Sequence, residues 1–312
     1  MTTQHFYRID RLSVVDVGGQ DADTILNNLT TNDMKSLEAG QGRETFVTEV
    51  RGRSLSHAFV YRQEGGLRLI SPEGPSEAIA AHVDRYTIRE DATPSILDNQ
   101  WVGFVVPPGE IWEPIAEALG APKSKDPSEP LVSFEWEWNG HSGTAYENRW
   151  LGEGTLLLLL DRSKADAMVT ASEQEGARLG DEADFHAART MAGFPWFGID
   201  LNEKNLPQEA DRDSLAISFT KGCYLGQETV ARLDALGKVQ KKLVQWKVVD
   251  TVPTAGTPLK MGEKVVGRLT SVAAEGDGCI SIGMARRTHF DPGSTAEGSD
   301  ETTEKTFTAT VL

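Results

Sequence analysis

Apolar positions in the first hundred residues follow two periods, one typical of helices and one typical of strands. After Asp21, a suitable N-cap, apolar residues recur at helical spacing and predict a helix over Ala22–Leu29. A second helix is predicted at residues 75–86. Strands are predicted at residues 9–17, 45–50, 54–62 and 67–71. This part of the chain therefore predicts an α+β unit with an antiparallel sheet.

Residues 101–240 repeat this organisation with weaker signals. The dipeptide Asn139-Gly140 is a strong turn signal and predicts a hairpin of residues 131–138 and 141–146. A strand is predicted at 155–160, and helices are predicted at 112–119, 164–179 and 184–192. A second sheet with covering helices is the expected result.

The pattern changes after Lys242, because helical spacing stops. Strands predicted at residues 243–249, 264–274, 278–286 and 305–311 are separated by turns that contain Gly or Pro. A small β-barrel or sandwich is expected from them. The predicted fold class is α+β, with two sheet-and-helix subdomains at about 1–100 and 101–240 and a C-terminal β-barrel at 241–312.

Charge and composition argue against several classes of protein. The 312 residues include 47 acidic and 31 basic side chains, and the net charge of −16 opposes broad nucleic-acid binding. No apolar run approaches the roughly 18 residues of a membrane helix, and no signal-peptide pattern opens the chain. Two cysteines without Cys-x-x-Cys spacing favour a reducing cytoplasm and argue against a cysteine zinc site.

The most informative segment is the octapeptide Lys-Gly-Cys-Tyr-Leu-Gly-Gln-Glu at residues 221–228. An apolar stretch at 215–219 predicts a strand before it, and residues 228–236 predict a helix after it. Cys223 is therefore expected near a helix N-terminus, with Lys221 close by, and both features favour the thiolate. Such a thiol could be a nucleophile, a metal or cluster ligand or a redox centre, or it could be a small buried turn residue.

Three segments occur in an order and spacing that resemble the YgfZ group of folate-binding proteins, in the superfamily of the glycine-cleavage T-protein, an aminomethyltransferase. They are residues 189–200, 206–210 and 221–232, and residues 21–33 fit the N-terminal helix of the superfamily. The resemblance implies two α+β subdomains and a C-terminal barrel around a central tetrahydrofolate pocket. It also implies a role in assembling or maintaining iron–sulfur enzymes, including those that thiomethylate tRNA.

The sequence departs from the aminomethyltransferases at positions that carry their chemistry. Aligned on Val60-Tyr61-Arg62, their Asp-Asp pair corresponds to Ser56 and His57, and their folate-binding Glu corresponds to Met191. A thioether does not accept hydrogen bonds from a pterin ring as a carboxylate does. Methylene transfer by the usual mechanism is therefore not expected, whereas pocket shape and folate affinity can survive.

The resemblance also names the expected site residues. Cys223 is the expected reactive thiol, with redox or transient covalent chemistry favoured over permanent metal ligation. Lys221 is the second candidate catalytic residue, and it would hold the thiolate or an anionic folate tail. Residues expected at or near the folate pocket are Asn32, Asp33, Gln208, Glu209, Gly222, Tyr224, Gln227, Glu228 and Arg232. No metal ligands are predicted.

The predicted function is a cytoplasmic tetrahydrofolate-binding protein that supports iron–sulfur enzymes, with folate and iron–sulfur client enzymes as its partners. Two alternatives stay open. One is a folate-dependent methyl or aminomethyl transferase with relocated acid–base groups, which turnover of tetrahydrofolate with a one-carbon donor would reveal. The other is a non-catalytic module that senses folate and regulates a partner, for which binding would not depend on Cys223.

Overall fold

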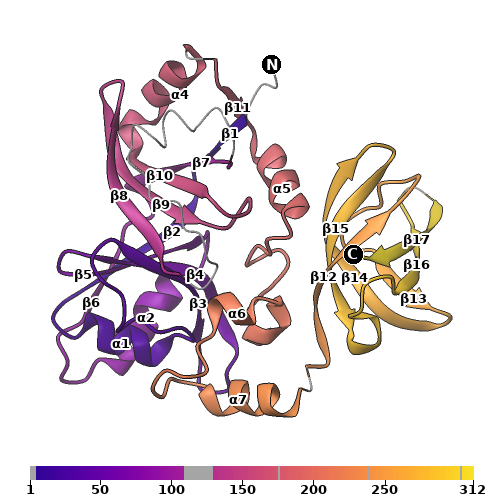
Figure 1. The fold of residues 1–312 in the computed structure, drawn as a ribbon, viewed down its shortest axis with the longest axis horizontal. Coiled ribbons are helices and arrows are strands. Elements are labelled where there is room, and N and C mark those ends of the chain that lie inside the picture. The colour runs from indigo at the N-terminus through magenta and orange to yellow at the C-terminus, as the bar shows by residue number, and fades with distance from the viewer. Residues whose placement is uncertain (1–4, 109–128, 175, 238, 303) are drawn as a thin grey trace.

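The computed structural model describes residues 5–108, 129–174, 176–237, 239–302 and 304–312. Figure 1 shows two parts, a large body of sheet and helices and a C-terminal barrel beside it. The predicted α+β class with a C-terminal β-barrel is confirmed. The helix predicted at residues 112–119 lies outside the described residues.

Eleven strands of the described chain form one continuous sheet in the body, in the order β11-β1-β7-β10-β9-β8-β3-β4-β5-β2-β6. The strands are β1 (His5–Ile9), β2 (Leu12–Gly18), β3 (Gln41–Thr48), β4 (Ser54–Gln63), β5 (Gly66–Pro72), β6 (Thr93–Ile96), β7 (Trp101–Val106), β8 (Leu131–Trp138), β9 (His141–Asn148), β10 (Thr155–Asp161) and β11 (Arg178–Gly180). One half contains β2 to β6, and the other contains β1 and β7 to β11. The strand β1 therefore lies apart from its neighbour in sequence, β2.

The two halves of the sheet meet between β3 and β8, where Gln41 pairs with Val132 and Gly42 with Leu131. Glycine is needed at position 42, because a Cβ atom there would lie 2.2 Å from the ring of Tyr61. An aromatic core crosses this junction, with Phe59 of β4 edge-on to Trp150 at a centroid distance of 6.3 Å. Side-chain packing therefore joins the halves more extensively than strand pairing does.

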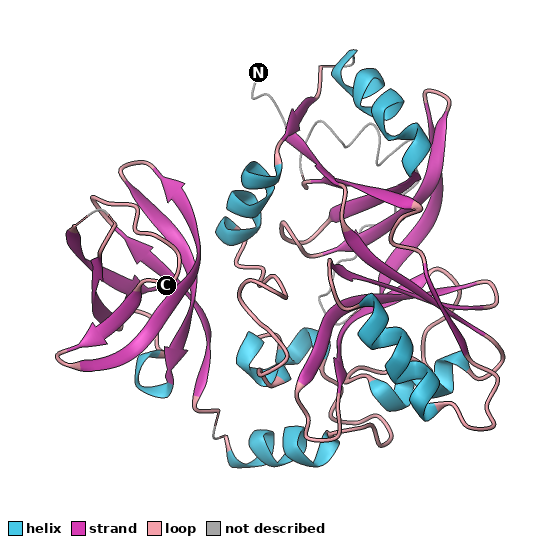
Figure 2. Cartoon of the chain, turned by 180° about the vertical axis from the view of Figure 1, so that it is seen from behind, coloured by secondary structure: helices cyan, strands magenta, loops and turns pink. Residues whose placement is uncertain are grey.

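Helices cover the body where apolar surface of the sheet must be buried. They are α1 (Ala22–Leu29), α2 (Ser76–Tyr86), α4 (Ala165–Gln174), α5 (Glu182–Met191), α6 (Asp213–Ala216) and α7 (Gln227–Leu236), with short 3₁₀ turns η1 (Arg162–Lys164) and η2 (Pro207–Ala210). A further 3₁₀ turn, η3 (Arg287–His289), belongs to the C-terminal barrel. The helices α1 and α2 pack on the half that contains β2 and β5, where Ile25, Leu26 and Ile79 enter the core. Figure 2 shows α5 between the body and the barrel.

Six strands of the described chain close into the barrel, in the order β12-β15-β14-β13-β16-β17. They are β12 (Lys241–Val248), β13 (Pro258–Met261), β14 (Lys264–Glu275), β15 (Gly278–Arg286), β16 (Thr295–Asp300) and β17 (Lys305–Val311). Trp246 and Leu269 are fully buried in its core. The strands β13 and β16 are missing from the sequence predictions, because both are short and β16 buries only Ala, Gly and Asp.

The predicted helix Ala22–Leu29 and the hairpin through Asn139-Gly140 are confirmed. Asp21 occupies the predicted N-cap position of α1, but its carboxylate makes no cap hydrogen bond and instead accepts the main-chain N–H of Asp91 at 2.8 Å. The strand predicted at residues 9–17 is divided between β1 and β2, because the chain passes there from one half of the sheet to the other.

Two further predictions fail for local reasons. The helix predicted at residues 164–179 ends at Gln174, and the chain after Gly176, which has a φ of 87°, pairs as β11 with β1. The strand predicted at residues 215–219 is replaced in part by α6, which runs from Asp213 to Ala216. An apolar run of this length does not distinguish a strand from a buried helical turn.

A buried ion pair attaches the barrel to the body. Arg189 of α5 places Nη1 2.7 Å from Oδ2 of Asp200, and both side chains are buried. Arg189 Nη2 donates to Ser271 Oγ of β14 at 2.8 Å, and that hydroxyl donates to Asp200 Oδ1 at 2.6 Å. Burial lowers the pKa of Arg189, an effect that the Asp200 carboxylate opposes. The charged pair therefore holds α5 and β14 together only as long as both partners are present.

We expect Asp200→Asn to lower the free energy of unfolding by about 3–5 kcal/mol, because it leaves the Arg189 cation buried without a counter-charge. The control is Asp166→Asn, which removes the highly exposed partner of Arg8 and should cost less than about 1 kcal/mol. Urea unfolding followed by tryptophan fluorescence measures both variants. Similar costs for the two would contradict the docking role of Asp200.

Candidate functional site

A cavity of about 340 Å³, here called the central cavity, opens beside the pairing of β3 with β8. It is lined by Asn32, Gly42, Arg43, Glu44, Glu129, Leu131, Arg149, Ser214, Leu215, Ile217, Ser218, Phe219 and Thr220. Three polar members, Asn32, Glu44 and Arg149, are each at least nine-tenths buried. Most of the lining is polar or charged, and its apolar side chains are Leu131, Leu215, Ile217 and Phe219. The volume lies within the range of small-molecule sites.

A buried carboxylate on β3 anchors the segment that follows α5. Glu44 accepts two hydrogen bonds from Arg212, one of them from Nη2 at 2.6 Å, and its Oε1 lies 2.8 Å from Nε2 of His57. Burial alone would raise the pKa of Glu44, but Arg212 and His57 outweigh it and hold that pKa well below its usual range. Glu44 therefore stays ionised, and it is a fixed anchor and a poor proton acceptor.

Aromatic rings enclose this carboxylate cluster. The His57 ring stacks between Phe46, at 4.5 Å, and Phe194, at 5.2 Å, and the Arg212 guanidinium lies 4.8 Å from the centre of the Phe194 ring. Burial lowers the pKa of His57, although the Glu44 carboxylate opposes this shift. His57 is therefore a core residue bound to Glu44.

The structure offers no carboxylate at the positions where the aminomethyltransferases carry theirs. Ser56 is fully buried, and its hydroxyl has no hydrogen-bond partner in the described part of the chain. Met191 ends α5 and is 40% exposed. The carboxylate that lies beside His57, that of Glu44, is already bound by Arg212. Proton transfer at this site by the family's usual groups is therefore not supported.

The wall of the central cavity leads directly into the octapeptide. Residues 214–220 line the cavity in part, and the chain continues into an exposed loop that contains Cys223. The predicted strand-to-helix junction is wrong, because α6 precedes the loop and α7 begins only at Gln227.

The ammonium of Lys221 binds the end of α1. Its Nζ donates to the carbonyls of Asn27 at 2.6 Å, Thr30 at 2.8 Å and Asn32 at 2.6 Å. Carbonyls at a helix C-terminus lack partners within the helix, so a lysine is well placed to satisfy them. The predicted role of Lys221, to hold the thiolate or an anionic folate tail, stays a prediction, and in the structure its ammonium binds these three carbonyls.

Two glycines bring the octapeptide against the turn between β3 and β4. Gly226 has a φ of 84°, and a Cβ atom there would lie 2.5 Å from Cα of Gly52. Leu225 N donates to Asn28 O at 2.8 Å, and Thr48 Oγ1 donates to Leu225 O at 2.7 Å. The thiol is exposed, but the main chain that follows it is fixed to α1 and to β3.

The other predicted pocket residues lie mostly outside the central cavity. Gln208 and Glu209 lie in η2, where Gln208 Nε2 donates to Val230 O at 2.7 Å and Glu209 Oε2 accepts from Asn205 Nδ2 at 2.6 Å. Asp33 accepts a hydrogen bond from the main-chain N–H of Lys35. Gly222 is exposed next to Cys223, and Tyr224 is buried. The remaining three, Gln227, Glu228 and Arg232, belong to α7. Asn32 is the predicted residue that lines the described cavity.

The sequence predictions missed the charged residues of the central cavity. Arg43 and Glu44 follow each other on β3, where charged neighbours suggest a solvent-exposed strand. Arg212 lies between Asp211 and Asp213, and such a run suggests a solvated turn. The pairing between positions 44 and 212 joins distant parts of the chain, and no local signal predicts it.

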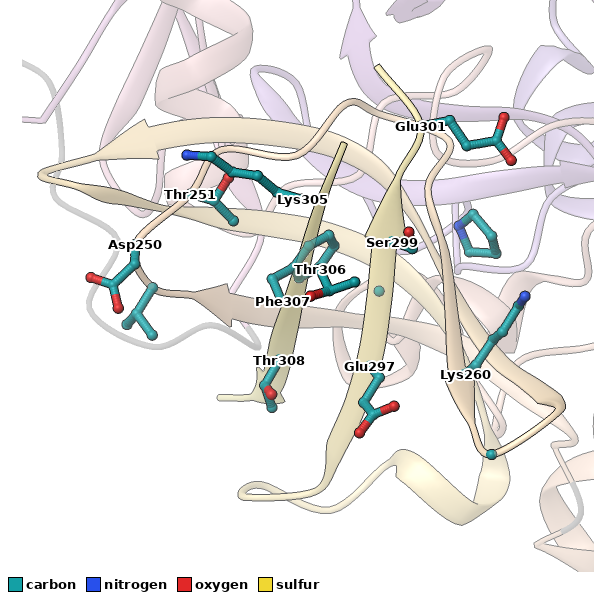
Figure 3. A pocket seen from close by; sticks show the side chains of 14 residues that line it. Asp250, Thr251, Lys260, Glu297, Ser299, Glu301, Lys305, Thr306, Phe307 and Thr308 are labelled. Carbon is teal, nitrogen blue, oxygen red and sulfur yellow. The ribbon is translucent and has the colours of Figure 1, made fainter. Parts of the chain in front are cut away.

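A second cavity of about 870 Å³ lies on the barrel (Figure 3). Its lysines, Lys260 and Lys305, lie among the acids Asp250, Glu297 and Glu301, and none of the predicted site residues lines it. Among the described residues, no group of three or more His, Cys, Asp or Glu side chains could hold a metal ion. No described helix is both long enough and apolar enough to cross a membrane.

The fold places the chain among proteins built like the aminomethyltransferases. No family model matches the sequence. The crystal structure of glycine cleavage system aminomethyltransferase T from Bartonella henselae superposes with a TM-score of 0.82, at 19% identity, over 99% of this chain and 86% of that one. The similarity at this level of identity establishes the shared fold.

Particular relatives agree with the resemblance noted in the octapeptide. The chain is 26% identical over 298 residues to the human mitochondrial iron–sulfur cluster assembly factor IBA57, covering 89% of this chain and 76% of that protein. It is 25% identical over 301 residues to the tRNA-modifying protein YgfZ of Klebsiella pneumoniae (strain 342), covering 92% and 86%. The predicted resemblance to the YgfZ group is therefore confirmed.

Asp213 opens α6, next to residues that line the central cavity. Its Oδ1 is buried without a hydrogen-bond partner in the described chain, and burial together with Asp211 and Asp234 raises its pKa to about 6. The folded protein therefore binds this proton more tightly than the unfolded chain does. Stability due to this group falls as the pH rises from about 4, its unfolded value, to about 6.

We expect Asp213→Asn to stabilise the protein by about 2 kcal/mol near neutral pH and by little near pH 4, because the amide removes a carboxylate that is costly only when ionised. Urea unfolding at the two pH values measures this difference. The control, Asp166→Asn, removes an exposed carboxylate that pairs with Arg8 and should not stabilise at either pH. An equal gain for Asp213→Asn at both pH values would contradict the assignment.

Proposed function

We propose that this protein binds tetrahydrofolate or a derivative in the central cavity and supports the assembly or maintenance of iron–sulfur proteins, with Cys223 as its reactive thiol. The observation that carries the proposal is the continuity of residues 214–220, which line the cavity and lead into the Cys223 loop. The names of the relatives, an iron–sulfur cluster assembly factor and tRNA-modifying proteins, support the biological role. Iron–sulfur enzymes that modify tRNA are therefore among the proposed clients.

The residues of the central cavity fit a folate. Arg43 and Arg149 supply guanidinium groups for the carboxylates of a glutamate tail, and Arg43 Nε is buried without a partner in the described chain. Phe219, which is 44% exposed, offers a ring for stacking, and Asn32 lies on the same lining. Tetrahydrofolate supplies a one-carbon carrier or a reduced pterin when bound. The arginines orient the ligand, and Phe219 shields it from water.

The alternative, a folate-dependent aminomethyl or methyl transferase, has the shared fold in its favour. Its acid–base groups have no counterpart at the corresponding positions, since Ser56 and Met191 carry no charge and Glu44 is held by Arg212. The arrangement favours ligand binding over methylene transfer.

The thiol is proposed to act outside the cavity, toward a protein partner. Cys223 is exposed, whereas Cys279 is buried in the barrel, and both are free. A lone thiol without neighbouring ligands in the described chain favours redox or transient covalent contact over permanent metal ligation. We propose a reducing compartment, the cytoplasm, as the setting, although the IBA57 relatives are named as mitochondrial.

We expect Cys223→Ser to bind tetrahydrofolate with unchanged affinity but to fail to restore iron–sulfur enzyme activity in cells that lack this protein, because the thiol lies outside the cavity. Calorimetry measures binding, and the activity of an iron–sulfur enzyme in extracts measures function. Cys279→Ala is the matched control and should preserve both. Full restoration by Cys223→Ser would refute the role of the thiol, and absence of binding to the wild type would refute the folate assignment.

A further inference from the structure

The ammonium of Lys221 fixes the main chain on both sides of the exposed Cys223 thiol. The three N–H groups of the Lys221 ammonium are matched by three main-chain carbonyls, of Asn27, Thr30 and Asn32. The ring of Tyr224 lies 5.1 Å from the same nitrogen and covers another side of it. Lys221 precedes Gly222 and Cys223 in the sequence, and Tyr224 follows them. The contact between the Lys221 ammonium and the Tyr224 ring therefore positions the main chain before and after the thiol.

One of these three carbonyls belongs to a residue of the central cavity. Asn32 lines the cavity, and its Nδ2 donates at 2.9 Å to the carbonyl of Glu44 on β3 and at 2.9 Å to the carbonyl of Leu215 on the opposite wall. Its own carbonyl accepts from Lys221. A continuous series of hydrogen bonds therefore runs from the cavity wall through Asn32 and Lys221 to the thiol loop.

We propose that Lys221 is a positioning residue, which couples ligand binding in the central cavity to the placement of the Cys223 thiol through Asn32. The coupling rests on the proposed function, because the ligand in the central cavity is the folate proposed above. A ligand against Asn32 and Leu215 fixes the main-chain carbonyl of Asn32, which the Lys221 ammonium binds. It therefore favours the arrangement in which Lys221 is bound to the end of α1. The loop is then held, and access to the thiol changes with occupancy of the cavity.

The contact between Lys221 and the three carbonyls depends on the protonation of its amine. Burial lowers the pKa of Lys221 to about 7, and the Asp33 carboxylate opposes this shift. Tyr224, the other titratable group in contact, keeps its proton, because burial raises its pKa to about 12. Only the ammonium has a donor for each of the three carbonyls, and the neutral amine lacks one. A ligand that holds the carbonyl of Asn32 in place therefore favours the protonated form of Lys221.

Alkylation of the thiol by iodoacetamide, followed by mass spectrometry, reports the coupling. Cys223 is exposed, whereas Cys279 is buried and burial raises its pKa to about 11, so the two thiols are separated by rate. We expect saturating tetrahydrofolate, under anaerobic conditions, to slow alkylation of Cys223 in the wild type about fivefold, the low end of typical coupling between sites. In Lys221→Met the rate should no longer depend on the ligand, while calorimetry still detects binding.

The matched control is Lys35→Met, which removes an exposed lysine close to the end of α1 and should keep the ligand effect. Lys221→Arg serves if Lys221→Met does not fold, because the planar guanidinium keeps the charge but does not reproduce the compact seat on three carbonyls. Lys221→Arg should fold, and tetrahydrofolate should no longer slow the alkylation of its Cys223 to the same extent.

The outcomes separate the coupling from the proposed function. A fivefold effect that persists in Lys221→Met or Lys221→Arg would overturn the coupling, as would a wild type that binds tetrahydrofolate without any change in the alkylation rate. The folate assignment would stand in both cases. A wild type that does not bind tetrahydrofolate would overturn the folate assignment and the coupling together.

Discussion

The ion pair between Glu44 and Arg212 is the interaction on which the candidate site depends. The chain between α5 and α7 has little regular structure, so side-chain anchors must hold it against the sheet. Arg212 binds the buried carboxylate of β3 and lies over Phe194 of the same segment. Because β3 also carries Arg43 and pairs with β8, this ion pair fixes one wall of the central cavity relative to the other. The loss of either partner would leave a buried charge and release that wall.

Cys223 differs from an ordinary surface cysteine because the main chain around its exposed thiol is held in place. The contact of Gly226 with Gly52, the hydrogen bond from Leu225 to Asn28 and the seat of Lys221 on α1 hold the chain around it. The thiol itself is free and exposed. The loop therefore exposes the side chain of Cys223 while the main chain around it is held in place.

Local periodicity was sufficient to predict most elements, because an apolar stripe such as that of Ala22–Leu29 must face a core. The octapeptide was sufficient to find the thiol loop. The contacts of the site could not be predicted, since the closeness of Lys221 to Cys223 in the chain, with Gly222 alone between them, does not fix where the lysine side chain goes. In the structure its ammonium turns to α1, nearly two hundred residues earlier in the chain. Arg212 and Glu44 were missed for the same reason, because their pairing joins segments 168 residues apart.

The central claim is that the central cavity and the thiol loop form one structural unit. Hydrogen–deuterium exchange with and without tetrahydrofolate tests this claim most directly, because it reports main-chain protection segment by segment. The account predicts slower exchange at residues 27–33 and 214–226 together, with the barrel at residues 241–312 unchanged. Protection confined to the barrel, or protection of the cavity wall without any change in the loop that carries Cys223, would contradict it.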